Sequence, residues 1–409
     1  MIELARRFPH DFTLQYPPRR EYFQENFRCQ RVSIADARLL YVHVPFCAHR
    51  CTYCNFAVDL SPDEARMERY VDTLIEQIER VPAAEAIDIG GGTPTRLPSR
   101  LLRRLLDALS RFAAPISIET TPEIAATYPL DALNGVDRVS VGLQTSDSDA
   151  LNAVGRPDAS LHARALAALR RFRRINIDLV FGLPGQTEAQ WLRDVEHAIA
   201  LQPDAITTYD CLYRGRGRSM TRRSLSAPSP ATYESLYERG RSLLRAAGYD
   251  APYGAMTYSR HRGESGTSVY FERRLFDGWS YRGIGTYATS HRDDVWTFEA
   301  AGVDRFLAGD VGDCYRLPRD ETIAKYLLLS LSFGRIDRAR YFARFGERIE
   351  DRFAAQLANL VEDDAGWGLR SFAALPQIRA SFYTERALAW LESLRQAGAR
   401  DGDERLGAA

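Results

Sequence analysis

Two hydrophobic patterns alternate along the chain from residue 39 onward. Short apolar or β-branched runs have the length and composition of strands. Between most of them apolar residues recur at i, i+3 and i+4, as at Leu101, Leu105 and Leu109, and this spacing predicts amphipathic helices. The predicted strands are Leu39–Phe46, Ala86–Ile89, Ile116–Glu119, Arg138–Leu143, Ile175–Phe181 and Ala205–Tyr209. The predicted helices between strands include Pro62–Val81, Ser99–Phe112, Ser160–Phe172 and Thr187–Leu201.

This alternation predicts an α/β fold, because neighbouring parallel strands need a helical crossover between them. A series of six such units closes, or partly closes, into a (βα)6 barrel. The ligand site of such a barrel lies on the loops that leave the C-terminal ends of the strands.

Composition and charge narrow the class of protein. Lys plus Arg and Asp plus Glu both number 54, so no net field favours nucleic acid or an anionic membrane. Lys325 is the only lysine. The N-terminus has no apolar signal core and no stretch approaches 18 apolar residues, so we expect a cytoplasmic protein without a membrane partner.

Three cysteines follow the first predicted strand in the spacing C-x3-C-x2-C: Cys47, Cys51 and Cys54. Three thiolates so close together can each bind one iron of a four-iron cluster and leave the fourth iron open. A structural zinc site would need a fourth ligand, for which only His43 and His49 are near. A disulfide would leave one thiol unpaired. The remaining cysteines, which we interpret as ordinary buried or half-buried thiols, are Cys29, Cys211 and Cys314.

The other predicted strands also end in polar residues or glycines. A single such residue is more often a capped strand end than a ligand. Together with the cysteine loop after the first strand, these make five consecutive strand ends, which are harder to explain by capping alone, and they predict a shared binding site. The residues are Gly90 to Thr93 after the second strand, Glu119, Gln144 with Arg156 beyond it, and Asp178 before Gly182 to Thr187.

The cysteine spacing followed by Gly-Gly-Thr-Pro resembles the radical S-adenosylmethionine (SAM) superfamily. The stretches 41–47, 139–144, 154–156 and 177–187 resemble its oxygen-independent coproporphyrinogen III oxidase family. The resemblance implies a radical SAM (βα)6 barrel over 39–215, after an N-terminal extension, 1–38. It also implies an extension that completes the active site, 216–315, and a C-terminal helical, winged-helix-like domain, 316–409.

The resemblance also implies roles for individual residues. Cys47, Cys51 and Cys54 would hold a [4Fe–4S] cluster. Carboxylates suit ribose hydroxyls, and an arginine suits a carboxylate. The residues implied for the first SAM are Tyr53 and Phe56 beside the adenine, Gly91, Gly92 and Thr93 at the amino-acid end, Glu119, Gln144, Arg156 and Asp178 at the ribose and carboxylate, and Tyr41 near the sulfonium. Those implied for a second SAM are Tyr209, Tyr213, Gly285 and Tyr287, with Tyr209 and Tyr213 as catalytic candidates.

The chain departs from the patterns of two groups in this family, and we base the expected function on these departures. The porphyrinogen oxidases have a fourth cysteine where this chain has Phe56, and a longer N-terminal region. The haem chaperones have a His-Asn-x-x-Tyr-Trp motif that Gly266–Tyr281 lacks, although His261 and His291 remain candidate haem ligands. We therefore expect a two-SAM methyltransferase or cyclopropane-forming enzyme of natural-product biosynthesis. Its expected partners are a small-molecule or peptide substrate, an electron donor such as flavodoxin or ferredoxin, and a partner methyltransferase as a further candidate.

Two alternatives stay open. The first is a coproporphyrinogen III oxidase-like or haem-degrading radical SAM enzyme. The second, from a different class of protein, is a haem chaperone that keeps the cluster but performs no turnover.

Overall fold

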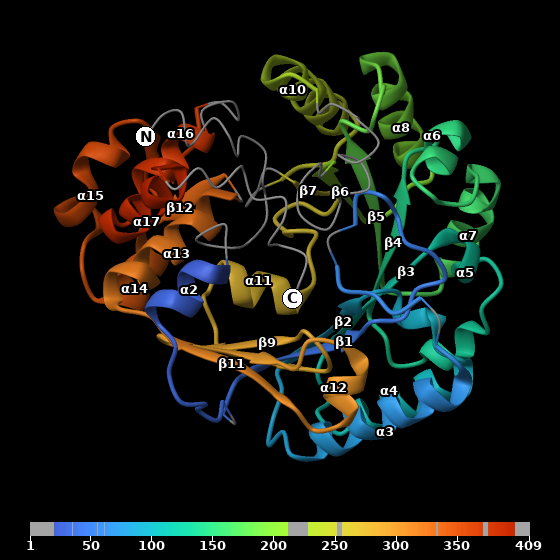
Figure 1. Ribbon diagram of the computed structural model, residues 1–409. Coiled ribbons are helices and arrows are strands. Elements are labelled where there is room, and N and C mark those ends of the chain that lie inside the picture. The colour runs from blue at the N-terminus through green and yellow to red at the C-terminus, as the bar shows by residue number, and fades with distance from the viewer. Residues whose placement is uncertain are drawn as a thin grey trace.

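The structure is a computed structural model that describes residues 20–34, 36–54, 56–60, 62–211, 228–251, 256–332, 334–370 and 375–396. A curved sheet with helices on its outer side forms the larger part of the molecule (Figure 1). The first six strands are β1 (Leu39–Val44), β2 (Ala86–Gly91), β3 (Ile116–Thr120), β4 (Arg138–Gln144), β5 (Arg174–Phe181) and β6 (Ala205–Asp210). All six predicted strands are confirmed, with ends within two residues of those expected.

Strands β1 to β6 pair side by side in chain order, and every pair is parallel. Helices connect them on the outer side, as the predicted α/β fold requires. The connecting elements are α3 (Glu64–Glu79), η1 (Pro94–Arg96), α4 (Ser99–Ser110), α5 (Pro122–Ala125), η2 (Leu130–Leu133), α6 (Ser148–Ala153), η3 (Ala159–Leu161), α7 (His162–Leu169) and α8 (Glu188–Ala200).

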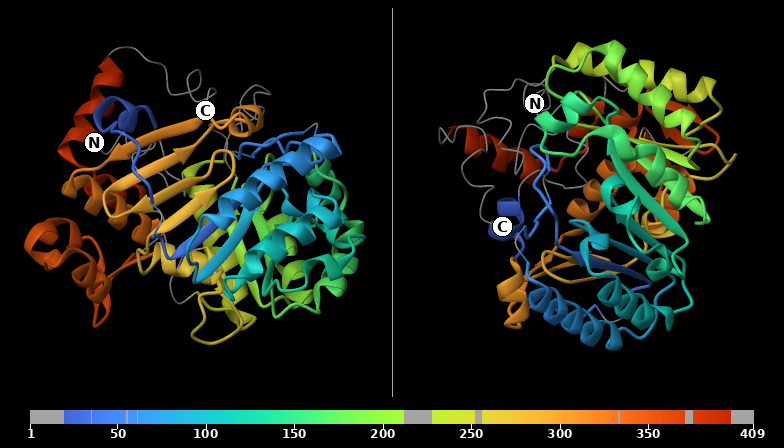
Figure 2. Two further views of the ribbon diagram at one scale, coloured as in Figure 1. Left: turned by 90° about the horizontal axis from the view of Figure 1, so that it is seen from below. Right: turned by 90° about the vertical axis from the view of Figure 1, so that its right-hand side faces the viewer.

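Among the described residues the sheet has eleven strands, five more than the sequence pattern predicted, in the order β11-β10-β9-β8-β1-β2-β3-β4-β5-β6-β7. The added strand β8 joins the free edge of β1 in parallel, and β7 joins β6 antiparallel. In Figure 2 the strands beyond β8 lie between helices α3 and α4 and the C-terminal helices. The added elements are α10 (Pro230–Ala246), β7 (Thr257–Ser259), α11 (Val269–Leu275), β8 (Tyr281–Ile284), β9 (Thr289–Arg292), β10 (Val295–Glu299), α12 (Val303–Leu307) and β11 (Val311–Arg316).

The two faces of β1 pack against different partners, because successive side chains of a strand point to opposite faces. Leu40 and Val42 belong to the large apolar core that the outer helices cover. Leu39 and Tyr41 pack instead with Tyr281 in a separate cluster. We call the face of the sheet that carries Leu39 and Tyr41 the inner face.

The C-terminal part contains five helices and a three-stranded sheet among the described residues. Helix α2 (Arg20–Asn26), from the other end of the chain, packs on it, and the Tyr22 hydroxyl donates to Glu321 at 2.5 Å. The prediction of a helical domain agrees with this arrangement, whereas its boundary at residue 316 stays a prediction. The elements are α13 (Arg319–Ser332), β12 (Arg335–Asp337), α14 (Arg338–Phe345), α15 (Ile349–Leu357), β13 (Val361–Asp363), β14 (Gly366–Gly368), α16 (Leu375–Ser381) and α17 (Glu385–Gln396).

The segment after α2 runs beside β11. The backbone N–H of Cys29 donates to the carbonyl of Cys314 at 2.9 Å, and the two sulfur atoms lie 3.1 Å apart. From the sequence we interpreted Cys29 and Cys314 as ordinary buried or half-buried thiols. The fold brings them into contact although they lie 285 positions apart.

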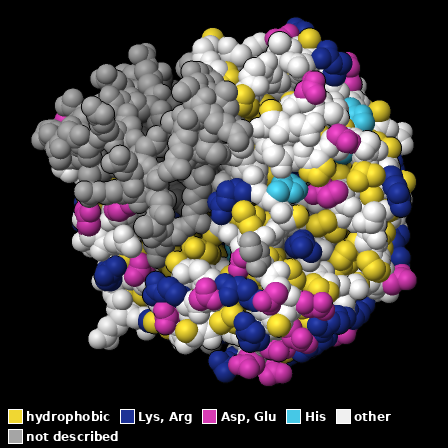
Figure 3. All heavy atoms as spheres, turned by 45° about the vertical axis from the view of Figure 1, so that its right-hand side comes forward, with side chains coloured by type: hydrophobic (Ala, Val, Ile, Leu, Met, Phe, Trp, Pro, Cys, Tyr) yellow, Lys and Arg dark blue, Asp and Glu magenta, His cyan; other side chains and the backbone are white. Residues whose placement is uncertain are grey.

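The surface carries charges of both signs. Basic and acidic side chains are interspersed on the face shown in Figure 3. Between α3 and α4, Arg100 lies 2.8 Å from Glu64, and Arg104 lies 2.6 Å from Asp72. No helix in the described part of the chain combines the length and apolarity needed to cross a bilayer.

Candidate active site

The three cysteines lie on a loop that leaves the C-terminal end of β1 and closes on itself. The Cys47 N–H donates to the Asp59 carbonyl at 3.1 Å, and the Asp59 N–H donates to the Pro45 carbonyl at 2.8 Å. Further along, the Thr52 N–H donates to the Val154 carbonyl at 3.1 Å. These bonds fix the loop to the end of its own strand and to the segment that follows β4.

The thiol of Cys51 lies in a cationic environment. Arg156 donates through Nε to its sulfur at 3.2 Å. Although burial opposes ionisation, hydrogen bonds from His49 and Arg156 lower the pKa of Cys51 to about 7. Burial raises the pKa of Cys47, and raises that of Cys54 to about 11. Cys51 is therefore the thiol most ready to act as a thiolate ligand.

The donor set fits a four-iron cluster better than a single metal ion. All three cysteines are free thiols on one short loop. Within the described ranges no three His, Cys, Asp or Glu side chains are grouped as ligands of one ion. A zinc ion would need such a group, whereas a cubic cluster takes each thiolate on a different iron, so the thiols need not converge on one point.

The glycine turn after β2 packs tightly against the end of β1. Gly91 has φ +114°, and a Cβ there would lie 2.6 Å from the His43 ring. A Cβ on Gly92 would lie 2.7 Å from the Pro45 carbonyl. The Thr93 hydroxyl lies 3.5 Å from the Cys47 sulfur. The glycines therefore bring this turn beside the cysteine loop, and their predicted contact with SAM stays a prediction.

Three carboxylates from neighbouring strands gather on the inner face. Burial, followed by repulsion from Asp88 and Asp178, raises the pKa of Glu119 to about 8. Burial also raises the pKa of Asp88 to about 6, against the attraction of Arg138, and raises that of Asp178. The Ser140 hydroxyl donates to Asp178 at 2.8 Å. Sequence reasoning missed Asp88 and Arg138, although an aspartate inside the apolar run of β2 was a detectable signal.

Gln144 and Arg156 meet at the end of β4. Gln144 has φ +70°, an uncommon backbone conformation for a residue other than glycine. The missing side chain of Gly142 leaves room for the Gln144 amide, and the Gly142 carbonyl accepts a hydrogen bond from Arg156 at 2.6 Å. Arg156 thereby links β4 to Cys51, so these two predicted site residues share one edge with the cysteine loop.

The predicted aromatic residues occupy different environments. The Tyr41 hydroxyl lies 3.3 Å from His43 Nδ1 on the inner face. Tyr53 packs with an apolar cluster that includes Leu183, whereas Phe56 lies outside that cluster and is 56% exposed. Tyr209 is 41% exposed, and the carboxylates of Asp178 and Glu119 lie near it.

The residues predicted for a second SAM are only partly described. Tyr213 lies outside the described residues. Gly285 and Tyr287 follow β8, beside the end of β1, and a Cβ on Gly285 would lie 2.5 Å from the His43 carbonyl. The Tyr287 N–H donates to the Ala300 carbonyl at 3.0 Å. A second SAM at these residues stays a prediction.

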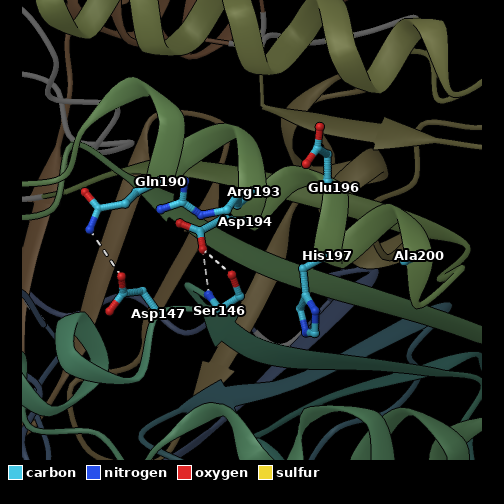
Figure 4. A pocket seen from close by; sticks show the side chains of 8 residues that line it. All are labelled: Ser146, Asp147, Gln190, Arg193, Asp194, Glu196, His197 and Ala200. Atoms are coloured by element: carbon cyan, nitrogen blue, oxygen red, sulfur yellow. Dashed lines mark hydrogen bonds between the residues drawn. The ribbon is translucent and has the colours of Figure 1, made fainter.

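A pocket of about 620 Å³ lies elsewhere, between α8 and the loop after β4 (Figure 4). The Asp194 carboxylate in this pocket is already hydrogen-bonded within the protein. It accepts from Thr145 at 2.9 Å, from the Ser146 N–H at 2.7 Å and from Gln186 at 2.9 Å. These bonds tie the loops after β4 and β5 together. We interpret this region as a support for the strand ends rather than as the reaction site.

Comparison with known proteins identifies the fold of this site. Residues 41–198, which carry the cysteine loop, the glycine turn and the inner carboxylates, match the family model of the radical SAM superfamily. Residues 41–198 are thus similar to a radical SAM domain, and we use this name for them below. Similarity to this superfamily implies a [4Fe–4S] cluster and SAM, and the cysteine loop is the site that fits the cluster.

The relatives of this chain include a porphyrinogen oxidase and a haem chaperone. An oxygen-independent coproporphyrinogen III oxidase of Pseudomonas aeruginosa is 34% identical over 232 residues, which cover 51% of this chain and 50% of that protein. The haem chaperone HemW of Bacillus subtilis is 26% identical over 79% of this chain and 90% of that protein. The coproporphyrinogen III oxidase HemN of Escherichia coli has the same fold, with a TM-score of 0.73, 23% identity and coverage of 88% and 95%.

These relatives overturn the expected natural-product methyltransferase or cyclopropane-forming activity. That expectation depended on Phe56 and on the missing His-Asn pair. Two local departures do not outweigh similarity to coproporphyrinogen oxidases and haem chaperones across the domain. The expectation was wrong because it treated the loss of two motifs as evidence for a third activity.

Proposed function

We propose that this chain is a radical SAM enzyme of the coproporphyrinogen III oxidase-like type, which removes a hydrogen atom from an acidic side chain of a tetrapyrrole. The observation that carries this proposal is the continuous edge formed by the cysteine loop, the glycine turn and the inner carboxylates, with the accessible Tyr209 beside it. Its relatives named as oxidases and its HemN-like fold support the tetrapyrrole as substrate class.

The chain's own residues would perform binding, orientation and charge placement. Cys47, Cys51 and Cys54 would hold the cluster, which when bound supplies the electron that cleaves SAM to a 5′-deoxyadenosyl radical. Arg156 holds the Cys51 side of the loop against β4. Glu119 would accept hydrogen bonds from the SAM ribose once it is ionised. A flavodoxin or ferredoxin remains the proposed electron donor.

A haem chaperone is the second candidate, because the alignment with B. subtilis HemW covers most of both chains. The candidate haem ligands argue against it. His261 lies 2.6 Å from Asp204, and this contact occupies its Nε2 atom. His291 is buried with its ring 4.2 Å from that of Trp296. Neither imidazole is presented as an open ligand in the described part of the chain, and enzyme turnover is therefore our main proposal.

The test uses the full chain, anaerobically reconstituted and reduced with dithionite. Coproporphyrinogen III deuterated on its propionate side chains should transfer deuterium into 5′-deoxyadenosine. Glu119→Gln should reduce the rate, whereas Arg305→Met on the exposed part of α12 should not. Deuterium transfer from SAM carrying a trideuterated methyl group, with no transfer from the porphyrinogen, would refute the proposal. Haem binding with a Soret band and no nucleoside product would favour the chaperone.

A further inference from the structure

Lys325, the only lysine among 54 basic residues, lies inside the molecule on α13. Only 7% of its surface is exposed. Its ammonium lies 4.1 Å from the centre of the Trp296 ring and 5.5 Å from that of Phe23. Within the described residues it has no acidic partner. Burying an unpaired ammonium is costly, and cation–π contacts offset only part of this cost.

A second cation lies beside this lysine without a carboxylate of its own. Arg274, on α11, donates to the Tyr281 hydroxyl at 3.1 Å, and its guanidinium lies 4.1 Å from the Tyr281 ring centre. Burial, and then the charge of Arg274, lowers the pKa of Lys325 to about 7. The two cations therefore repel each other, and no described acid separates them.

The other charged groups around this pair do not neutralise it. Arg344 on α14 donates to the Gly278 carbonyl, and its Nε has no partner in the described structure. Burial, followed by the charges of Arg344 and Lys325, lowers the pKa of His291 well below its usual value. Glu321, one turn from Lys325 on the same helix, accepts instead from Tyr22 and Thr384. Asp293 attracts Arg344, so in this region the three cations Lys325, Arg274 and Arg344 face two carboxylates, Glu321 and Asp293.

This cationic region continues the inner face of the radical SAM domain. Tyr281 pairs with Leu39 of β1 and with His291 of β9, and His291 pairs with Trp296 of β10. Paired residues share a face, so this row lies on the same face as Tyr41. Arg274 also lowers the pKa of Asp88, which pairs with Tyr41. Arg274 thus lies between the inner carboxylates and Lys325.

We propose that Lys325 and Arg274 form a binding site for a carboxylate of the substrate, at the end of the inner face away from β2. A carboxylate placed between them can accept a charge-assisted hydrogen bond from each cation and removes their mutual repulsion. This inference rests on the proposed function, because a tetrapyrrole with acidic side chains can bring one of them here while another part of the molecule lies beside the SAM site.

The single lysine gives a direct readout in the unmodified sequence. Reconstituted full-length protein made with lysine carrying ¹³C at Cε has one lysine side-chain signal, whose shift reports the charge of Lys325. We expect coproporphyrin III, the stable oxidised form of the porphyrinogen, to raise the apparent pKa of Lys325. The shift should be near one pH unit or more, as an adjacent carboxylate produces.

Variants measure the contribution of the charge to binding. Lys325→Met keeps the length and apolar stem and should weaken coproporphyrin III binding by about tenfold or more, as the loss of a charge-assisted hydrogen bond predicts. Lys325→Arg should restore most of the affinity, and Arg305→Met, which changes an exposed cation, should leave it unchanged. The melting temperature of Lys325→Met should stay equal or rise, because an unpaired buried charge is removed.

The outcomes separate this inference from the proposed function. If wild type and Lys325→Met bind coproporphyrin III equally well, the carboxylate site is refuted and the tetrapyrrole substrate is retained. If wild type does not bind coproporphyrin III but propane-1,2,3-tricarboxylate shifts the lysine signal, the site is supported and the tetrapyrrole is refuted. If neither compound shifts the signal, the carboxylate site is refuted. Because the lysine signal is read in wild type, poor folding of a variant does not remove the test.

Discussion

The affinity for SAM should depend on pH through Glu119. Burial and the neighbouring Asp88 and Asp178 raise the pKa of Glu119 to about 8. In the SAM-free protein this carboxyl is therefore mostly protonated at pH 6 to 7. If the ionised form accepts the ribose hydroxyls, binding must release a proton in this range. The ionised form increases as pH rises through about 8, so SAM should bind more tightly at higher pH.

The size of the effect follows from the pKa. At pH 6, about two pH units below the pKa of Glu119, about one molecule in a hundred has the ionised carboxylate. Ionising it costs about 2.7 kcal/mol, so the SAM dissociation constant should be about a hundredfold larger at pH 6 than above pH 9. Glu119→Gln cannot ionise. Above pH 8 it should bind SAM more weakly than wild type, by roughly 1.5–3 kcal/mol.

Calorimetry on the anaerobically reconstituted protein, in buffers of different ionisation enthalpy, measures both the affinity and the released proton. Asp88 and Asp178 face the same space, and the pKa of Asp88 is raised to about 6. In the Glu119→Gln variant the SAM affinity should therefore still change with pH near 6, but less than in wild type. A wild-type affinity that is constant from pH 6 to 8.5 would contradict this reasoning. If the SAM affinity of wild type and Glu119→Gln changed equally with pH, the released proton would belong to another group, such as the SAM amine.

Three further predictions concern the site and its scaffold. Replacing the three cluster cysteines with alanine should abolish the roughly four irons and the broad absorbance near 400 nm that a [4Fe–4S] protein shows, whereas Cys211→Ala should keep both. Gly91→Ala should cost about 1–3 kcal/mol more in chemical denaturation than Gly309→Ala, because both have positive φ but only Gly91 would press a Cβ on a neighbouring ring. Mild oxidation should join Cys29 to Cys314, detectable by non-reducing peptide mapping, and failure to crosslink at 3.1 Å would contradict the packing of the N-terminal segment.

Much of the radical SAM domain could be predicted because its signals are local. Each strand from β1 to β6 is an apolar run, and each long helix has its own stripe of buried residues, as α3 has in Tyr70, Val71 and Leu74. The cysteine loop and the glycine turn could be placed together because parallel strands end at the same edge. The five added strands were not predicted, since β7, β8 and β9 have only three or four residues each and β8 joins an edge far away in sequence.

The site was less predictable where the chemistry depends on tertiary contacts. Asp88 and Arg138 lie on β2 and β4, the two strands that pair with β3, and the register of these pairs makes their side chains neighbours of Glu119. Lys325 has no motif around it. Its single occurrence in an arginine-rich chain was visible, but its burial beside Arg274 depends on how α13 packs against the inner face.

The position of β1 in the middle of the sheet affects how the protein is made. Its partner β8 starts at Tyr281, 237 residues after the end of β1 at Val44. Protein synthesis adds about 5–20 residues per second, so one edge of β1 stays unpaired for roughly 12 to 50 seconds before β8 has been made. An unpaired strand edge can associate with other chains. We therefore expect chains truncated before residue 281 to aggregate, and the cysteine loop at the end of β1 to be most accessible for cluster delivery before β8 joins.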